Sequence, residues 1–414
     1  MRKRRILKCI LWIIIAAVAL KEASGYGYTR LGLELEQRIK EAAFRLGPLR
    51  IKTVLYLREF GYDNNVFRTP SNPVKDFTLT AGPGFQIYLP VSKKIVFSIY
   101  ESPQYVYFRE TKRERTWNNY FNGQAHFAFN RFFFTLGKGY SVAREIWNSE
   151  IDIRPQRKED SYQGSAMWQP SKKTSFLFRY SQAKYDYEDL AFERTSIKRE
   201  LNRVEKYVNA TGYYRLSFRT MFFVDFTYGN FHFEDPLSLK NSKSYGLSGG
   251  FEFSPTGVVR GRINLGYKLL KPLAAGTQEY RGIFGDTNVS VRVLKPLNLR
   301  ASYKRDISFS IWYNNAYFIE NRAGLGASLY LFKSIRLDYD FSLGRNNYPQ
   351  SSVLPEGATQ KRRDRFQYHS VGIYFRIKKN IGAGVSVYQW TRDSNLSWEN
   401  ANKTFLGMNL TYDF

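Results

Sequence analysis

The sequence predicts an all-β protein: a transmembrane, up-and-down antiparallel β-barrel of about 18 strands (16–18) with a short N-terminal helix. Three observations predict this fold. Apolar and polar residues alternate along most of the chain, short and long connections alternate between these runs, and the last residue is an aromatic, Phe414. The chain has 31 Tyr and 33 Phe, yet its mean hydropathy is −0.45. A barrel needs this combination because alternate residues face lipid and water.

Residues 1–25 have the layout of a cleaved secretory signal peptide. A basic stretch at residues 2–8 precedes an apolar run from Ile10 to Leu20, and small residues follow at Ala23 and Gly25. The apolar run is short for a membrane-spanning helix, so an uncleaved anchor is the weaker alternative. Cys9 is the only cysteine, so the mature chain would have no disulfide, thiolate metal site or cysteine nucleophile.

Residues 26–48 form the second segment, and residues 49–414 are assigned to the barrel. Leu35, Ile39, Ala42 and Leu46 recur on one face of a helix predicted over residues 29–47, which Gly47-Pro48 ends. We expect a periplasmic or interfacial helix. A plug inserted into the lumen is the alternative.

From Leu49 onward the hydrophobic period is two, as in a half-buried strand. Tight turns are predicted at residues 90–93, 130–131, 170–173, 216–219, 254–257, 295–298, 332–334 and 378–380. Long polar loops are predicted at residues 61–76, 109–116, 146–160, 188–200, 234–242, 344–364 and 391–402. Eight turns define sixteen strands, and one strand at each end of the barrel brings the total to about 18. An even number places both termini in the periplasm.

The final strand carries the most specific motif. Leu406, Met408, Leu410, Tyr412 and Phe414 occupy alternate positions. This segment resembles the outer-membrane assembly signal, an amphipathic strand that ends in an aromatic residue. The resemblance implies an outer-membrane location in a Gram-negative cell and implies that the barrel-assembly machinery is a partner, which would recognise Leu410, Tyr412 and Phe414.

A second motif follows the first predicted strand. The tract Gly61-Tyr62-Asp63-Asn64-Asn65-Val66-Phe67 resembles the start of members of the group called putative β-barrel porins. Some members of that group are associated with exopolysaccharide production. The resemblance supports the barrel more than it supports any substrate.

The chain is strongly basic, with 63 Lys and Arg against 36 Asp and Glu and a formal net charge of +27. Loss of residues 1–25 would remove six basic residues and one acid, which leaves a net charge of +22. A barrel of this size encloses an aqueous channel, and basic residues that line it would favour anions. The pore-lining basic candidates are Arg260, Arg262, Lys268, Arg292, Arg300, Lys304 and Arg336.

Mutual neutralisation is the alternative for these residues, for instance Arg300 or Lys304 with Asp338 or Asp340 across strands. Further basic clusters at residues 109–115, 154–158 and 361–365 fall in predicted loops. They would meet lipopolysaccharide phosphates and outer-membrane lipid, or capture an acidic polymer. Nucleic acid is not an expected partner, because no recognised binding module accompanies the charge.

An enzyme is not predicted, and no catalytic residue, cofactor or metal ligand set is assigned. The three histidines, His126, His232 and His369, are scattered and lack metal-ligand spacing. His232 near Asp235 is the only pair that suggests a hydrolase, and one such pair is expected by chance.

The functional expectation is a porin-like channel for small anionic or saccharide solutes that selects through a basic lumen. The alternatives are a component of exopolysaccharide secretion and a structural barrel with a plugged lumen. Porin-like barrels often trimerise, so a homo-oligomer is compatible with this expectation.

Overall fold

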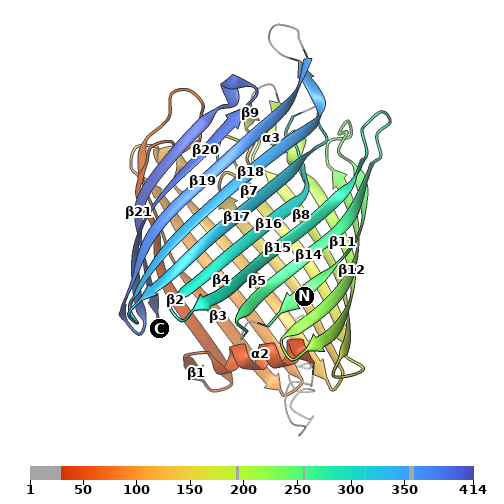
Figure 1. The fold of residues 1–414 in the computed structure, drawn as a ribbon, viewed down its shortest axis with the longest axis vertical. Coiled ribbons are helices and arrows are strands. Elements are labelled where there is room, and N and C mark those ends of the chain that lie inside the picture. The colour runs from red at the N-terminus through yellow and green to blue at the C-terminus, as the bar shows by residue number, and fades with distance from the viewer. Residues whose placement is uncertain (1–28, 193–194, 255–256, 313, 354–358) are drawn as a thin grey trace, which may run out of the picture.

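The computed structural model describes residues 29–192, 195–254, 257–312, 314–353 and 359–414 (Figure 1). The predicted signal peptide lies outside these residues. No helix among them is long and apolar enough to cross a membrane.

The described chain forms a closed antiparallel barrel in which each strand pairs with the next and the last pairs with the first. Seven strands, β2 to β8, and eleven strands, β11 to β21, make up the ring of 18. The first group is β2 (Leu49–Asp63), β3 (Asp76–Ser92), β4 (Ile95–Phe108), β5 (Thr116–Phe129), β6 (Phe132–Arg144), β7 (Gln156–Trp168) and β8 (Thr174–Tyr187). The second is β11 (Arg203–Ser217), β12 (Thr220–Phe233), β13 (Ser242–Phe253), β14 (Val259–Pro272), β15 (Tyr280–Leu294), β16 (Leu297–Phe309), β17 (Tyr317–Leu331), β18 (Ile335–Val353), β19 (Thr359–Lys378), β20 (Ile381–Ser394) and β21 (Ala401–Asp413).

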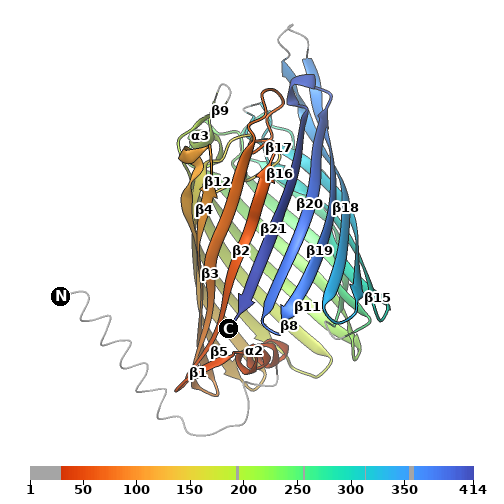
Figure 2. The same ribbon diagram turned by 90° about the vertical axis from the view of Figure 1, so that its left-hand side faces the viewer.

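The predicted barrel of about 18 strands is therefore confirmed. The eight predicted tight turns all fall between paired strands at one end of the barrel, which we call the turn end. The opposite end, the loop end, carries the long connections. These include the short hairpin β9 (Ala191–Phe192) and β10 (Thr195–Ser196), the helix α3 (Ile197–Leu201), and the 3-10 turns η1 (Lys112–Glu114) and η2 (Ser397–Glu399). Figure 2 shows α2 and the C-terminus together at the turn end.

One predicted loop is wrong. Within the predicted loop of residues 344–364, residues 344–353 continue β18 and residues 359–364 belong to β19, and the two stretches pair with a register shift between Asn347 and Ser351. Residues 354–358 lie outside the described residues. The hairpin extends because alternation persists through this polar stretch: Asn346 and Tyr348 are buried on the inner face, while Arg345 is exposed on the outer one. A polar stretch therefore does not show where a strand ends. It can also be the part of a strand that rises above the membrane.

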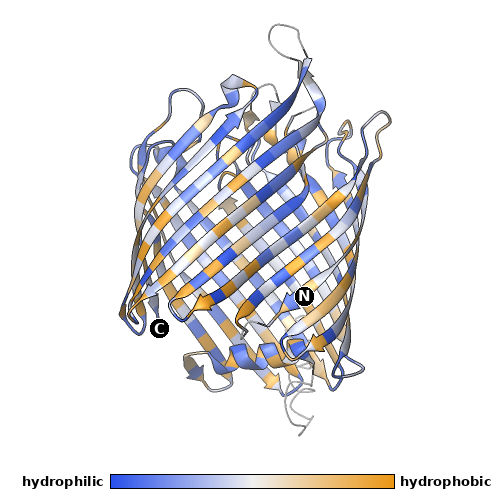
Figure 3. Ribbon diagram, viewed as in Figure 1, coloured by the Kyte–Doolittle hydropathy of each residue, from blue (hydrophilic) through white to orange (hydrophobic). Residues whose placement is uncertain are grey.

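The two faces of the wall differ as the alternating sequence predicts. Leu265 and Tyr267 on β14 are 57% and 56% exposed on the outer face, as lipid-facing side chains should be. Lys268, the next residue, faces the lumen and binds Asp306 on β16. Figure 3 shows the resulting alternation of apolar and polar residues along the strands.

The Asn-rich tract that follows β2 closes the seam between the first and last strands. The Asn64 amide donates to the Thr404 carbonyl, and the Asn64 side-chain oxygen accepts from the Thr404 amide. Asn65 Nδ2 donates to the carbonyl of Asn402. Asp63 pairs with Lys403 in a buried contact. These contacts join the first strand of the barrel to the last. They explain why the tract contains asparagines and an aspartate.

The helix α2 (Arg30–Lys40) lies across part of the turn end (Figure 1). Thr29 caps it by accepting a hydrogen bond from the Gly32 amide. Leu35 and Ile39 pack on inward-facing residues of the wall between β3 and β12, among them Phe133 and Phe223. α2 is shorter than the predicted helix, because residues 44–46 form the small strand β1 (Phe44–Leu46), which pairs with β2.

Candidate functional site: the barrel lumen and its constrictions

A loop crosses the lumen near the loop end. Residues 145–155, the crossing loop, leave the wall between β6 and β7 and reach β18 and β20, on the opposite side of the ring. The loop's Ser149 accepts a hydrogen bond from Asn346 Nδ2 at 2.8 Å, and its carbonyl accepts one from Arg392 Nη1 at 2.8 Å. A segment held on both walls divides the interior into compartments.

Glu150 provides the deepest contact of the crossing loop. Its fully buried carboxylate accepts hydrogen bonds from Ser310 Oγ at 2.7 Å and from the Ile311 amide at 3.0 Å. Burial raises the pKa of Glu150 above its ordinary value. Burial likewise raises the pKa of Asp152 to about 6, although Arg392, 3.8 Å away, opposes the shift. The docked loop therefore favours protonated carboxyl groups.

A buried charge cluster on the far wall supports this docking. Arg362 Nε donates to both carboxylate oxygens of Asp364 at 3.0 Å, and Arg362 Nη2 donates to Glu399 at 3.0 Å. Arg392 Nη2 lies 3.3 Å from the same Glu399 carboxylate. Because each charge has an opposite partner, the cluster holds Arg392 in place to bind the crossing loop.

The near wall and the other loops hold the crossing loop from the remaining sides. The Arg157 guanidinium lies 3.4 Å from the ring centre of Trp147, whose Nε1 donates to the Pro155 carbonyl. Ile151 packs with Ile311 and with apolar residues from the β8–β11 connection: Tyr187, Phe192, Ile197 and Leu201. The crossing loop is thus a packed element of the barrel interior.

A cavity of about 650 Å³ lies against the crossing loop on the β2–β5 side of the barrel. Three arginines line it: Arg58 from β2, Arg68 from the β2–β3 connection and Arg154 from the crossing loop. The buried Nε groups of Arg68 and Arg154 have no hydrogen-bond partner among the described residues. Four tyrosines and two glutamates share the cavity: Tyr56, Tyr100, Tyr120, Tyr388, Glu59 and Glu145. We call it the basic cavity.

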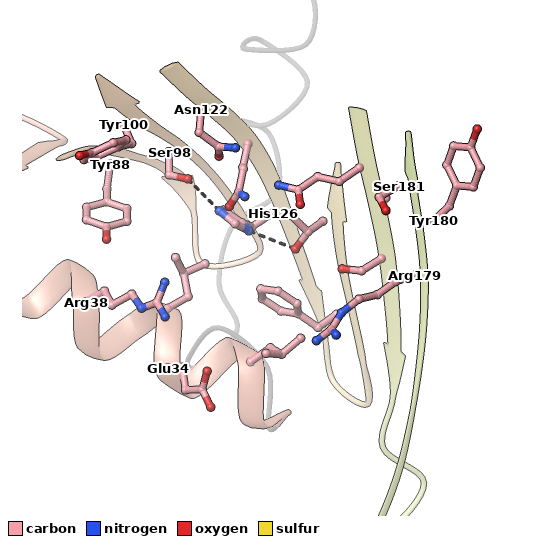
Figure 4. Close-up of a pocket in the computed structure, with 18 of the residues that line it drawn as sticks. Glu34, Arg38, Tyr88, Ser98, Tyr100, Asn122, His126, Arg179, Tyr180 and Ser181 are labelled. Carbon is pink, nitrogen blue, oxygen red and sulfur yellow. Dashed lines mark hydrogen bonds between the residues drawn. The ribbon is translucent and has the colours of Figure 1, made fainter. Parts of the chain in front are cut away.

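A second cavity, of about 580 Å³, lies above α2 and shares Tyr100 with the basic cavity. Figure 4 shows Arg38 extending from α2 towards His126, which hydrogen-bonds to Ser98 at 2.9 Å and to Thr135 at 3.2 Å. Amides and hydroxyls make up most of its polar lining: Gln86, Asn122, Gln124, Gln163, Ser165, Ser181 and Asn209. Glu34, Arg38 and Arg179 also line this cavity, which we call the amide-lined cavity. Its amides and hydroxyls can exchange hydrogen bonds with a polar solute.

α2 covers one side of the turn-end mouth. Beyond its contacts with β3 to β12, it reaches β13 through an ion pair between Arg30 and Glu252. A cavity of about 370 Å³ at the same end is lined by residues 330–336, 374–383 and 409–413 and by no residue of α2. The helix is therefore a partial plug of the turn end.

Four of the seven predicted pore-lining residues are neutralised by acids. Lys268 binds Asp306, Lys304 lies 2.9 Å from Glu320, Arg300 lies 2.7 Å from Asp340 and Arg336 lies 2.9 Å from Asp338. Mutual neutralisation, the alternative weighed from the sequence, therefore applies to these four positions, and it includes the pairing of Arg300 with Asp340. Their wall of the barrel carries less free charge than its arginine content suggests.

The other three candidates are spread along the same wall. Arg262 stacks on Phe223 with its guanidinium 3.9 Å from the ring centre. Arg260 Nη2 donates to Ser290 at 3.4 Å, and Arg292 is exposed near the turn end. The structure therefore does not gather the seven residues at one narrow point.

Sequence reasoning missed the basic cavity as a unit. Arg58 comes from the first strand, Arg154 from a loop and Lys403 from the last strand, so only barrel closure and the folding of the crossing loop bring them together. The signal in the sequence was a basic residue beside the Asn-rich tract, Arg68, with no acid next to it.

The histidine and aspartate weighed as a catalytic pair lie apart. His232 is exposed on the outer face of β12, whereas Asp235 binds Arg199 at 2.7 Å. Within the described residues, no group of three His, Asp, Glu or Cys side chains could hold a metal ion.

The residues of the predicted assembly signal lie at the turn end of β21. Leu410 and Phe414 are 44% and 43% exposed on its outer face. The rings of Tyr412 and Phe414 meet edge to face with centroids 4.5 Å apart.

Comparison with solved structures finds similar barrels at low identity. One is OpdK of Pseudomonas aeruginosa, solved with vanillate, at 12% identity over 88% of this chain and 98% of that one, with a TM-score of 0.49. Another is OccK3 (OpdO) of the same organism, at 12% identity over 93% and 99%, with a TM-score of 0.48. The siderophore receptor PirA of Acinetobacter baumannii matches at 9% identity over 88% and 80%, with a TM-score of 0.44.

No curated protein sequence matches the chain. A family model described as "Putative beta-barrel porin 2" matches residues 148–414, more than half of the chain. The matched part begins inside the crossing loop and runs to the C-terminus, so it leaves out the Asn-rich tract. Porins are outer-membrane channels and not enzymes. The chain belongs to the Putative beta-barrel porin 2 family.

Proposed function

We propose that this barrel conducts small anionic solutes, acidic saccharides among them, and that the basic cavity is its selectivity filter. The observation that carries the proposal is the convergence of three guanidinium groups, on Arg58, Arg68 and Arg154, on one cavity of the lumen. Arg154 lies 3.8 Å from Glu114, whereas Arg58 and Arg68 form no ion pair with a carboxylate of the described residues. A carboxylate or phosphate of a passing solute would accept hydrogen bonds from such groups, because guanidinium suits these anions.

The two cavities would recognise different groups of a solute. The basic cavity would bind its charged group, and the second cavity would bind its hydroxyl groups. The arginines of the basic cavity attract an anion, and tyrosines beside them offer both an apolar face and a hydroxyl. The amide-lined cavity, which meets the basic cavity at Tyr100, offers amides and hydroxyls. This order of surfaces suits a small sugar acid better than an apolar solute.

Uptake into proteoliposomes tests the filter. Wild-type barrels should admit glucuronate faster than glucose, and the Arg58→Gln/Arg68→Gln double variant should lower that ratio about fivefold or more, because it removes two cations and a free donor. The matched control is Arg300→Gln/Asp340→Asn, which removes an ion pair from the opposite wall without changing the net charge. Equal effects from both double variants would refute the assignment of the filter to the basic cavity.

A closed, structural barrel is the competing function, and two elements favour it. The crossing loop spans the interior, and α2 covers part of the turn end. A folded barrel that admits neither solute would establish that function instead. Export of a polysaccharide chain would require the crossing loop to leave its docked position.

We also propose the orientation of the barrel: the loop end faces the cell exterior and both termini face the periplasm. Long loops at one end and tight turns at the other support this orientation. The outer-face aromatic at the end of β21, Phe414, supports recognition by the barrel-assembly machinery from the periplasmic side.

A further inference from the structure

The extended hairpin of β18 and β19 carries an outward-facing basic groove. Arg345, Lys361, Arg363 and Arg365 line a surface cavity of about 500 Å³ together with Gln360, Asp393, Ser394 and Asn395. The four cations are exposed on the outer face of the hairpin. The neighbouring inward-facing residues, Arg362 and Asp364, belong to the buried cluster that supports the crossing loop. The groove is thus separate from the lumen and from the proposed filter.

Two cations of this groove face each other in register. Arg345 on β18 is the direct cross-strand partner of Arg365 on β19. Like charges directly opposite one another destabilise a strand pair. Asp393 is the cross-strand neighbour of Arg365 on the other side, yet it forms no ion pair with it in the described residues. Arg363 and Lys361 likewise have no carboxylate partner there. The groove therefore holds four cations and one carboxylate, Asp393, which leaves an excess of positive charge.

The height of the groove on the barrel identifies where a neutralising anion would come from. Below Arg345, the outer face of β18 presents Leu343 and Tyr339, which are 47% and 45% exposed. Below Arg365, the outer face of β19 presents Val371 and Ile373, at 51% and 40%. Residues two apart on a strand are about 7 Å apart. Arg345 is therefore one outer-face position above the apolar band, and Arg365 is three positions above it, with Gln367 and His369 between. We expect lipid headgroups at this level.

A second pair of like charges lies five strands away around the ring. Lys243 on β13 faces Lys271 on β14 in register, and both are exposed above the apolar outer-face residues Leu247 and Tyr267. Two unrelated strand pairs thus place like charges opposite each other at the same end. A lipid headgroup level rich in phosphate explains both, because phosphate between two cations replaces repulsion by attraction.

We propose that the groove of Arg345, Lys361, Arg363 and Arg365 binds the phosphate groups of the phosphorylated glycolipid in the outer leaflet, lipopolysaccharide. The paired arginines grip one phosphate through two-pronged hydrogen bonds, while the apolar outer face below them packs on its acyl chains. Lys243 and Lys271, which lack the guanidinium fork, form a weaker contact of the same kind. The proposal rests on the loop end facing outwards and not on conduction through the lumen.

Binding of bisphosphorylated lipid A to the folded full-length barrel in detergent, followed by native mass spectrometry, tests the groove. The Arg345→Gln/Arg365→Gln variant should bind about tenfold more weakly or worse, because two charge-assisted contacts are lost. The control Lys75→Gln/Lys198→Gln removes the same charge from exposed positions at the same end, outside the three basic loop clusters, and should bind like the wild type. Heat-modifiable migration of each variant verifies that it is folded.

Three results would overturn the proposal. They are wild-type affinity in the Arg345→Gln/Arg365→Gln variant, equal binding of dephosphorylated lipid A, and complete displacement of lipid A by inorganic phosphate at an equal concentration. The last would make the groove a site for free phosphate. Solute uptake by the same variant should remain at the wild-type level, so failure of this proposal and failure of the proposed channel are distinguishable.

Discussion

Asp152 shows how a single residue can link the crossing loop to pH. Its side chain is 19% exposed and lies 3.8 Å from Arg392, while Arg362 and Glu399 are its further charged neighbours. Burial raises its pKa to about 6 from 3.8, so the docked loop holds a proton more tightly than a released loop would. The docked position therefore gains stability as the pH falls through 6 towards 4, and loses it as the pH rises.

Conductance of the refolded barrel should consequently fall between pH 7 and pH 5, because the crossing loop docks more firmly. Asp152→Asn is neutral at every pH and should flatten this response at the low-conductance level. Glu150, whose pKa is raised in the same direction, accounts for any slope that remains. Single-channel recordings at stepped pH measure the effect. A full wild-type response in Asp152→Asn would show that another group is responsible.

Charge pairing at the residue scale was partly open to prediction. Arg300 on β16 and Asp340 on β18 are both in register with Gly326 on the strand between them, and they meet across this glycine because it has no side chain. The arginines of the basic cavity were not predictable in the same way. Arg68 and Arg154 sit outside the strands, and no periodicity dictates where a loop side chain will point.

At the scale of elements, the crossing loop controls how much of the lumen is open. Glu150→Ala would leave Ser310 Oγ and the Ile311 amide without their acceptor, at a cost of about 1–3 kcal/mol for each buried group. We expect a larger and noisier conductance with an unchanged unfolding temperature of the barrel. The control Glu279→Ala breaks an exposed pair with Arg281, which is worth about 0–1 kcal/mol. Identical recordings from the two variants would contradict a gating role for the loop.

The seam between the first and last strands is a second element with a measurable contribution. Asn65 donates to the carbonyls of Thr69 and Asn402 and accepts from the Thr69 amide. Asn65→Ala should lower the free energy of unfolding by about 1–3 kcal/mol. Asn65→Ala should also slow barrel closure. Asn395→Ala loses two comparable bonds between β19 and the β20–β21 connection, away from the seam, and should slow closure less. Urea unfolding and refolding followed by heat-modifiable migration compare them, and equal refolding rates would argue against a special role for the seam.

Elements with a strict period were predictable from the sequence and irregular elements were not. Period-two alternation fixed the strands and the tight turns, because each side chain must face either lipid or water. The polar composition of residues 344–364 predicted a loop, whereas β18 and β19 extend into this range and pair with each other. The docking of residues 145–155 depends on partners from β18, β20 and the β16–β17 connection, which no local pattern contains.

For the whole molecule, orientation is the first consequence to test. Cys9 is the only cysteine and lies in the predicted signal peptide, so the Cys9→Ser chain is a cysteine-free background for introduced thiols whether or not that peptide is cleaved. Leu237→Cys at the loop end and Phe218→Cys at the turn end replace side chains that are 70% and 88% exposed. A membrane-impermeant maleimide on intact cells should label the first and spare the second. The reverse pattern would invert the barrel and remove the basis for lipopolysaccharide binding.

The central question for the whole molecule is whether ions pass through an 18-strand barrel that contains a crossing loop and a partial plug. The most direct measurement is the reversal potential of the folded wild-type barrel in a planar bilayer under a salt gradient. We predict stable single-channel openings with a reversal potential of the sign given by anion selectivity, reduced in Arg58→Gln/Arg68→Gln. A heat-modifiable, correctly folded barrel that shows no conductance, or one that selects cations, would contradict the account.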